Sequence, residues 1–227
     1  MRVHLAVGLL IAVLLSGCGT DRQVSGAPIP VATTSAVDPA ADAAAIRSTF
    51  EKYRAELLAQ NGPGVPPLVS PRTIGHYDQV VRLAQKAGPA EIAGAGMMDR
   101  IMIARLRVEM PPEQLATLDG ARLLIYGVDE GMIDASSVDG HSLGEVRVEG
   151  DRGFAEMLLG SEPTGVDWEF VRVGPGWTFD LAAGFPLIND TLSQAAAESD
   201  LSEDEFVFDA VSMVTGLPVD ATVFAAP

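Results

Sequence analysis

The sequence feature that most constrains the fold is a change in hydrophobic pattern at Leu143. Between residues 38 and 132, apolar side chains recur three and four residues apart, as on one face of a helix. From Leu143 onward, apolar and polar residues alternate, as in strands with one buried face. Helical segments followed by neighbouring strands predict an α+β domain, in which helices pack on an antiparallel sheet.

The first two helices are predicted from their N-terminal signals. Asp38-Pro39 and Ser70-Pro71 each combine a capping side chain with proline at the first helical position. The first helix carries a narrow apolar stripe, formed by Ile46, Phe50, Tyr53 and Leu57. The second places His76 within an apolar arc, where we interpret it as a histidine at the edge of the core.

The segment Met98 to Glu109 fits either a helix or a strand. We favour the helix, because Pro111-Pro112 and a further helical segment follow it. In that helix Arg105 lies in the middle of the apolar face and needs a carboxylate partner, since an unpaired buried guanidinium is very costly. Glu109, one turn later, or Asp180 is the expected partner.

The second half of the chain predicts a four-stranded antiparallel meander and two more helices. Gly174-Pro175-Gly176 is a strong hairpin signal between the last two strands. Ser202 and Glu205 form a capping box before the final helix. The expected strands are 143–149, 154–159, 166–173 and 177–182. The expected helices are 185–197 and a final one ending at Gly216. The apolar stripe of that final helix is Phe206, Ala210, Met213, Val214 and Leu217.

Cys18, the only cysteine, follows a short apolar run and two small residues. Arg2 precedes the run, and the run itself, Leu5 to Leu15, is shorter than the roughly 18 residues that span a bilayer. This pattern indicates a secretory signal rather than a membrane span. Leu15-Ser16-Gly17-Cys18 is similar to the lipobox of bacterial lipoproteins. That resemblance implies acylation of Cys18, cleavage after Gly17, and a domain anchored to the cell membrane or the outer membrane, outside the cytoplasm.

These boundaries give the expected organisation of the chain. Residues 1–17 are the signal peptide, 18–37 the lipidated cysteine and a flexible tether rich in Ala, Pro, Ser and Thr, 38–217 a single α+β domain, and 218–227 a tail.

Composition excludes several classes of function. One cysteine allows no internal disulfide and no zinc site built from thiolates. The formal net charge is −16, and it becomes −17 when residues 1–17, with Arg2, are removed. Such a surface repels phosphate, so we expect no nucleic-acid partner. Nucleotide-binding glycine motifs are missing and only His76 and His141 remain in the mature chain, so we expect no cofactor and no metal.

The stretch Phe170-Val-Arg-Val-Gly-Pro-Gly-Trp177-Thr-Phe-Asp-Leu181 resembles a hairpin of the nuclear transport factor 2-like (cystatin-like) superfamily. In that superfamily a strand ends in a glycine turn and the return strand begins Trp-x-apolar-Asp. The resemblance covers Asp38 to Ala182 and implies a cone, with N-terminal helices packed on a curved four-stranded sheet around a pocket. This chain departs from the pattern in its extra helix before the sheet, its short sheet and an added C-terminal helix that could cover the cone.

Asp180 is the sharpest catalytic candidate. It follows Trp177 beside apolar residues, an environment suited to general-base chemistry. The resemblance implies that such a base works with a hydrogen-bond donor, for which Tyr126 or Tyr77 is available, while Arg105 and Trp177 are candidate pocket residues. The alternative is that Asp180 faces solvent or pairs with Arg172 or Arg105.

Gly140-His141-Ser142-Leu143-Gly144 matches the G-x-S-x-G nucleophile elbow of hydrolases, but we reject that interpretation. The elbow requires a strand before the serine and a helix after it, whereas here a strand follows. No histidine follows the serine either.

Two functions are consistent with the sequence. The first is a non-catalytic module of the cell envelope that binds a small apolar ligand or a protein partner. The second is an isomerase- or dehydratase-like enzyme with Asp180 as general base. We favour the first.

Overall fold

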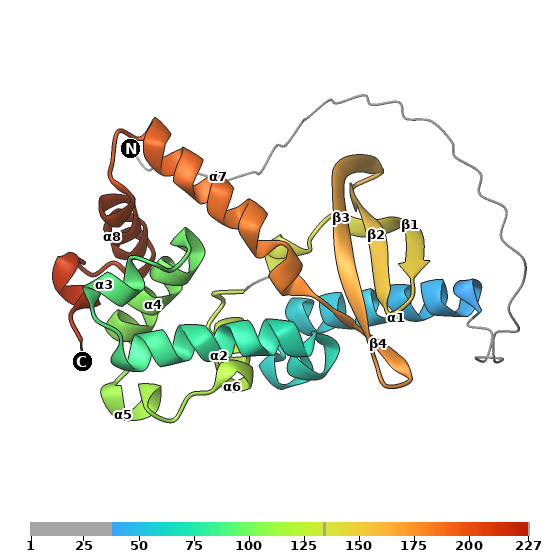
Figure 1. Cartoon of the computed structure of the whole chain (residues 1–227), viewed down its shortest axis with the longest axis horizontal. Helices are drawn as coiled ribbons and strands as arrows, with labels where there is room; N and C mark the ends of the chain where they lie inside the picture. The colour runs from blue at the N-terminus through green and yellow to red at the C-terminus, as the bar shows by residue number, and fades with distance from the viewer. Residues whose placement is uncertain (1–37, 134, 227) are drawn as a thin grey trace, which may run out of the picture.

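The computed structural model describes residues 38–133 and 135–226, and it confirms the predicted α+β class (Figure 1). Helices come first, an open antiparallel sheet follows, and further helices complete the described chain. The helices are α1 (Pro39–Leu58), α2 (Pro71–Lys86), α3 (Pro89–Ile92), α4 (Met97–Glu109), α5 (Pro112–Leu115), α6 (Gly120–Asp129), α7 (Phe185–Glu198) and α8 (Glu203–Thr215), and the 3-10 turns are η1 (Gly62–Gly64), η2 (Pro66–Leu68), η3 (Ala135–Ser137), η4 (Leu181–Ala183) and η5 (Ala221–Phe224).

The sheet is the predicted four-stranded meander, with strand order β1-β2-β3-β4. All neighbouring pairs are antiparallel, and Phe170 lies opposite Phe179 in the last hairpin. Irregular register between Leu143 and Val146 interrupts the first strand pair; such bulges bend strands. The strands are β1 (His141–Glu149), β2 (Arg152–Leu159), β3 (Glu162–Val173) and β4 (Gly176–Phe179).

Helix α1 packs across one face of this sheet, beside β1 and β4. Its predicted stripe is confirmed, because Ile46, Phe50, Tyr53 and Leu57 are all buried. The N-cap is also as predicted: the Asp38 carboxylate accepts a hydrogen bond from the Ala40 amide at 3.0 Å. The opposite face of the sheet carries ion pairs, including Arg147 with Asp167 and Arg152 with Glu169.

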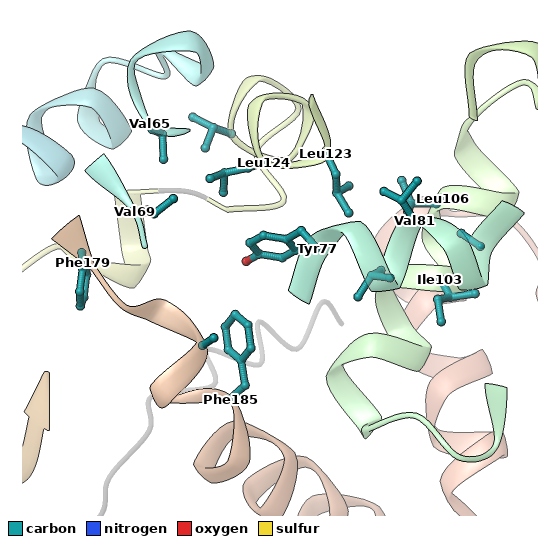
Figure 2. Close-up of a cluster of buried hydrophobic side chains, with 14 of the residues drawn as sticks. Val65, Val69, Tyr77, Val81, Ile103, Leu106, Leu123, Leu124, Phe179 and Phe185 are labelled. Atoms are coloured by element: carbon teal, nitrogen blue, oxygen red, sulfur yellow. The ribbon is translucent and has the colours of Figure 1, made fainter. Parts of the chain in front are cut away.

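Residues 98–109 lie in α4, so the helical interpretation is confirmed and the strand interpretation is wrong. Helices α2, α4 and α6 share an aliphatic core (Figure 2). Figure 2 shows this core continuing from Leu106 and Ile103 at one end to Phe179 of β4 at the other. The protein therefore has a sheet end, made of α1 and β1 to β4, and a helical end, made of α2, α4, α6, α7 and α8.

Helix α8 buries its predicted stripe only in part. Its capping box at Ser202 and Glu205 is present, and its fully buried residues are Val207 and Val211. Of the predicted stripe, Phe206 packs against the core, but Met213 is 77 % exposed and Val214 62 % exposed. Val214 is three residues after Val211 and on the same face, so the expectation was wrong for the last turn of α8, which extends beyond the packed surface.

The segment after α8, expected to be a tail, packs on the helical end as far as it is described. Phe224 is buried and its ring lies 5.3 Å from that of Phe208. The guanidinium of Arg107 donates to the carbonyls of Val223 and Ala225, at 3.1 and 2.8 Å, and to three carbonyls at the end of α2. Burial lowers the pKa of this arginine, whose five hydrogen bonds all go to carbonyls rather than to a carboxylate.

Among the described residues, no helix is long and apolar enough to span a bilayer. The predicted signal peptide, cleavage site and tether lie outside the described residues.

Candidate functional site

Asp180 lies just after β4 and joins the sheet to the start of α2. Its carboxylate accepts hydrogen bonds from the hydroxyls of Ser70 (2.7 Å) and Thr73 (3.3 Å) and from Nη1 of Arg72 (3.0 Å). The side chain is only 3 % exposed. In addition, the backbone amide of Ser70 donates to the carbonyl of Phe179 at 2.8 Å. This carboxylate is therefore fully engaged in holding two elements together.

The expected strand 177–182 contains Asp180, with Arg172 or Arg105 as its expected partner. Strand β4 ends at Phe179, just before Asp180, and the partner is Arg72. Neither Arg172 nor Arg105 contacts it within the described chain, so both expected pairings are corrected. The N-cap serine at position 70 determines the outcome, because it brings the first turn of α2, with Arg72, against the end of β4.

Arg105 pairs with Glu109 one turn later in α4, as one of the two alternatives expected. Nε and Nη2 donate to the two carboxylate oxygens at 3.2 and 3.1 Å. Tyr126 of α6 is near this pair, and its pKa is raised by burial first and then by the negative charges of Glu109 and Glu130, against the positive charge of Arg105. No described contact links Arg105 or Tyr126 to Asp180, so these three candidates do not form one site.

Tyr77 is buried in α2, between the sheet end and α7. Its ring lies 5.9 Å from that of Phe185, and Figure 2 shows the two side chains facing each other. Burial, followed by the charge of Asp99, raises the pKa of its hydroxyl. Tyr77 is thus a core residue at the junction of the two ends.

Trp177 is buried in a second charged cluster, on the inner face of the sheet. Its indole Nε1 donates to Oδ1 of Asp42 at 2.9 Å, and Nη2 of Arg172 donates to Oδ2 at 2.7 Å. The guanidinium of Arg172 also lies over the indole, 4.4 Å from the ring centroid. The hydrogen bond from Arg172, and then that from Trp177, hold the pKa of Asp42 below its usual range.

The space between α1 and the sheet, where a cone would have its pocket, is filled by aromatic rings. Phe170 stacks on Phe179 with 4.9 Å between centroids, and Phe50 lies 4.6 Å from Trp168. Tyr53 packs edge-on against Phe179 at 5.2 Å. Such close packing leaves no room for a ligand between these side chains.

An open groove of about 400 Å³ lies on the helical side of Asp180, between α2 and the start of α7. His76 lines it, with Nε2 2.8 Å from Oδ1 of Asp99 and its ring 4.6 Å from that of Phe185. This confirms His76 as a histidine at the edge of the core, with a carboxylate partner on α4. The groove is lined by Arg72, Gly75, His76, Gln79, Ala182, Phe185, Pro186 and Asn189.

The G-x-S-x-G motif enters a strand, as predicted. His141 and Ser142 are the first residues of β1, and Arg47 of α1 donates to the carbonyls of Leu143 and Gly144. The motif therefore lacks the strand before the serine and the helix after it that an elbow requires.

Sequence reasoning missed Arg72, Asp99 and Asp42. Each lies in the first turn of a helix, where an acid such as Asp42 or Asp99 is unremarkable by itself because it complements the helix dipole. Asp99 and His76 are 23 residues apart, and Asp42 and Arg172 are 130 apart. No local spacing links such pairs. The one usable signal was Ser70-Pro71-Arg72-Thr73, which places two hydroxyls and a guanidinium at one helix start.

Gly17 and Cys18, the predicted cleavage and acylation residues, lie outside the described residues. Described His, Cys, Asp and Glu side chains form no group that could hold a metal ion. Comparisons with protein-family models, with curated proteins and with solved structures find no match to the chain.

Proposed function

We propose that this chain is a lipid-anchored protein of the bacterial cell envelope whose domain binds a protein partner and catalyses no reaction. The observation that carries the proposal is the exposed end of the predicted α8 stripe, Met213, Val214 and Leu217. Met213 and Val214 are in the last turn of α8, and Leu217 follows its C-cap, Gly216. A contiguous apolar patch on a domain surface is typical of a protein-binding site.

The filled interior of the sheet end favours a protein partner over a small apolar ligand. Phe50, Trp168, Phe170 and Phe179 occupy the space that such a ligand would need. For the same reason we do not extend the resemblance to the nuclear transport factor 2-like superfamily beyond the hairpin and the order of the elements.

The alternative enzyme function has no support in the geometry around Asp180. A general base needs a lone pair that can reach a substrate, and this carboxylate is buried and accepts from Ser70, Arg72 and Thr73. No described contact brings a tyrosine to it.

Charge indicates the kind of partner. The chain carries 31 acidic and 15 basic side chains. The partner's surface should therefore be apolar where it meets the end of α8 and basic overall, because opposite potentials favour encounter.

The partner is tested by placing a photo-crosslinking amino acid at Met213 in the native host. We expect a discrete crosslinked product with a second protein after illumination. The control carries the same amino acid at Lys52, which is exposed on α1, and should give no such product. Equal products from both positions, no product, or a product of twice the chain mass would contradict the proposal.

The anchor is tested separately, by mass spectrometry of the mature protein and by its partition into detergent. From the lipobox resemblance we expect an acylated N-terminus at Cys18 and cleavage after Gly17. We also expect partition into detergent, because burying acyl chains stabilises membrane attachment by ~0.8 kcal/mol per CH₂. Cys18→Ala should prevent both acylation and cleavage. An unmodified Cys18 thiol in membrane-free protein would contradict the anchor.

A further inference from the structure

The groove between α2 and α7 is built from one face of α2. Arg72, Gly75, His76 and Gln79 follow each other at helical spacing and lie along this face. The facing wall comes from the start of α7 and is mainly apolar, with Phe185 and Pro186 as its larger members. The groove and the exposed end of the α8 stripe therefore involve different helices.

Gly75 forms the floor of the groove, and the fold gives no packing reason for a glycine there. It lies within α2, and a Cβ added to it would meet nothing within 4 Å. Glycine inside an exposed helix costs about 0.5–1 kcal/mol relative to alanine. Because no side chain of the described protein occupies the space above Gly75, that space is open to a ligand.

The unused polar groups around the groove are mainly hydrogen-bond donors. Arg72 gives only Nη1 to Asp180, and its side chain is 60 % exposed, so other guanidinium N–H groups are available. Asn189 accepts from the Met98 amide through Oδ1, which leaves its NH₂ group. The amide of Gln79 has no hydrogen-bond partner within the described chain.

The two carboxylates beside the groove are largely shielded from a ligand. Asp180 is 3 % exposed and accepts from three donors, and Asp99 is 13 % exposed, with its Oδ1 2.8 Å from Nε2 of His76. The wider negative charge of the protein is screened beyond about 8 Å at physiological ionic strength.

We propose that this groove binds a small carboxylate with an apolar body. The carboxylate accepts hydrogen bonds from the free guanidinium edge of Arg72, because that group matches two carboxylate oxygens at once. Gln79 and Asn189 supply further donors, and the apolar body packs on Phe185 and Pro186. A ligand of this kind uses the open floor at Gly75, the surplus of donors and the apolar wall together.

The experiment titrates benzoate and its uncharged analogue benzamide into the isotope-labelled protein and follows the backbone amide signals of Gly75 and Gln79 by NMR. We expect benzoate to bind with a Kd on the order of millimolar, as for a good ligand of this size, and benzamide to bind at least about tenfold more weakly. No binding by benzoate, or equal binding by the two, would overturn the proposal.

Two variants locate the site. Gly75→Leu fills the floor without removing a hydrogen bond and should abolish benzoate binding, whereas Gly75→Ala should keep it and stabilise the helix. Arg72→Gln should weaken benzoate binding at least about tenfold and leave benzamide unchanged. Arg122→Gln, which changes an equally exposed arginine on α6, is the matched control and should have no effect. Benzoate binding that survives Gly75→Leu would place the ligand elsewhere and overturn the assignment, even if Arg72→Gln fails to fold.

Discussion

The sheet end and the helical end of this protein bury their side chains in different ways (Figure 1). The sheet end has an aromatic interior between α1 and the sheet, with a largely buried ion pair, Asp42 with Arg172, beside the indole of Trp177. The helical end has an aliphatic interior (Figure 2), in which Arg100 of α4 pairs with Glu203 and Asp204 of α8 and Arg107 donates to carbonyls of the C-terminal segment. It also leaves an apolar stripe and a groove at the surface.

This difference indicates which end of the protein is structural and which end carries the candidate functional surfaces. At the sheet end the large apolar side chains that stay exposed, Leu58, Leu159 and Val173, are single residues at the ends of α1, β2 and β3. At the helical end exposed apolar residues are neighbours, Leu187 with Ile188 on α7 and Met213 with Val214 on α8. We therefore expect function at the helical end and structural roles for the charged residues at the sheet end.

The largest expected effect comes from emptying the aromatic interior. Phe170→Ala should lower the free energy of unfolding by about 3–5 kcal/mol, because Phe170 is completely buried and its removal leaves a cavity. Urea unfolding measures this. Phe154→Ala, on the outer face of the sheet beneath Arg152, is the control and should cost no more than about 1 kcal/mol. If Phe170→Ala is tolerated as well as the control, the sheet end is not a closely packed interior, and a ligand cavity there regains support.

The next effect comes from separating the two ends at Asp180. Asp180→Ala should lower the free energy of unfolding by about 2–3 kcal/mol, because it leaves the buried hydroxyls of Ser70 and Thr73 without their acceptor. Arg72→Ala should cost less than about 1 kcal/mol, since that side chain is largely exposed. Equal effects in the two variants would show that the exposed ion pair, rather than the buried hydroxyls, joins the ends.

The buried ion pair of the sheet end predicts a pH dependence. The pKa of Asp42 is lowered in the folded state, chiefly by Arg172, so the folded protein releases its proton more readily than the unfolded chain does. Its stabilisation is therefore complete above the ordinary aspartate pKa of about 3.9 and is lost as the pH falls through the lower folded pKa.

Urea unfolding of the wild type and of Asp42→Asn, from neutral pH into this acid range, tests the dependence. The variant should be less stable at neutral pH, and the gap should close as the wild-type carboxyl becomes protonated. Because Asp42→Asn keeps the shape of the side chain, the other acidic groups cancel in the difference. A gap that does not change with pH would mean that the Asp42 charge contributes no stability.

The smallest effect is expected on the exposed side of α8. Val211→Ala should cost about 2 kcal/mol, because Val211 is completely buried. Met213→Ala should change the stability by no more than about 0.5 kcal/mol, since Met213 is 77 % exposed. Thermal unfolding of the two variants compares the two sides of one helix. A large loss from Met213→Ala would mean that the stripe is part of the core, and the docking surface proposed here would be removed.

Local sequence signals predicted most of the fold. Asp38 and Ser70 cap helices because a short polar side chain satisfies a free amide at a helix start, which needs no distant partner. Gly174-Pro175-Gly176 joins β3 to β4 in the expected hairpin, since the turn sets the register between adjacent strands. The stripe of α1 was predicted correctly because that helix has only one apolar face.

The candidate site was predicted far less well. Asp180 was the sharpest catalytic candidate, with solvent exposure or pairing with Arg172 or Arg105 as the alternatives, and its partners were misassigned, because the sequence does not say which helix start will meet the end of β4. Tyr126, Tyr77 and Arg105 are on the helices that the sequence predicts; Tyr126 lies near Arg105, but Tyr77 packs on Phe185, and no described contact links Tyr126 or Arg105 to Asp180.

The sequence by itself determined the α+β class, the helix starts and the strand pairing of this protein, because these follow from periodicity, capping and turn chemistry within a few residues. Only the tertiary structure decided which arginine meets Asp180, that His76 meets Asp99, and which side of α8 faces water. The physical reason is that the fit between distant elements determines which of several similar apolar surfaces is buried and which of several carboxylates pairs with a given arginine or histidine. The order of residues along the chain does not specify that fit.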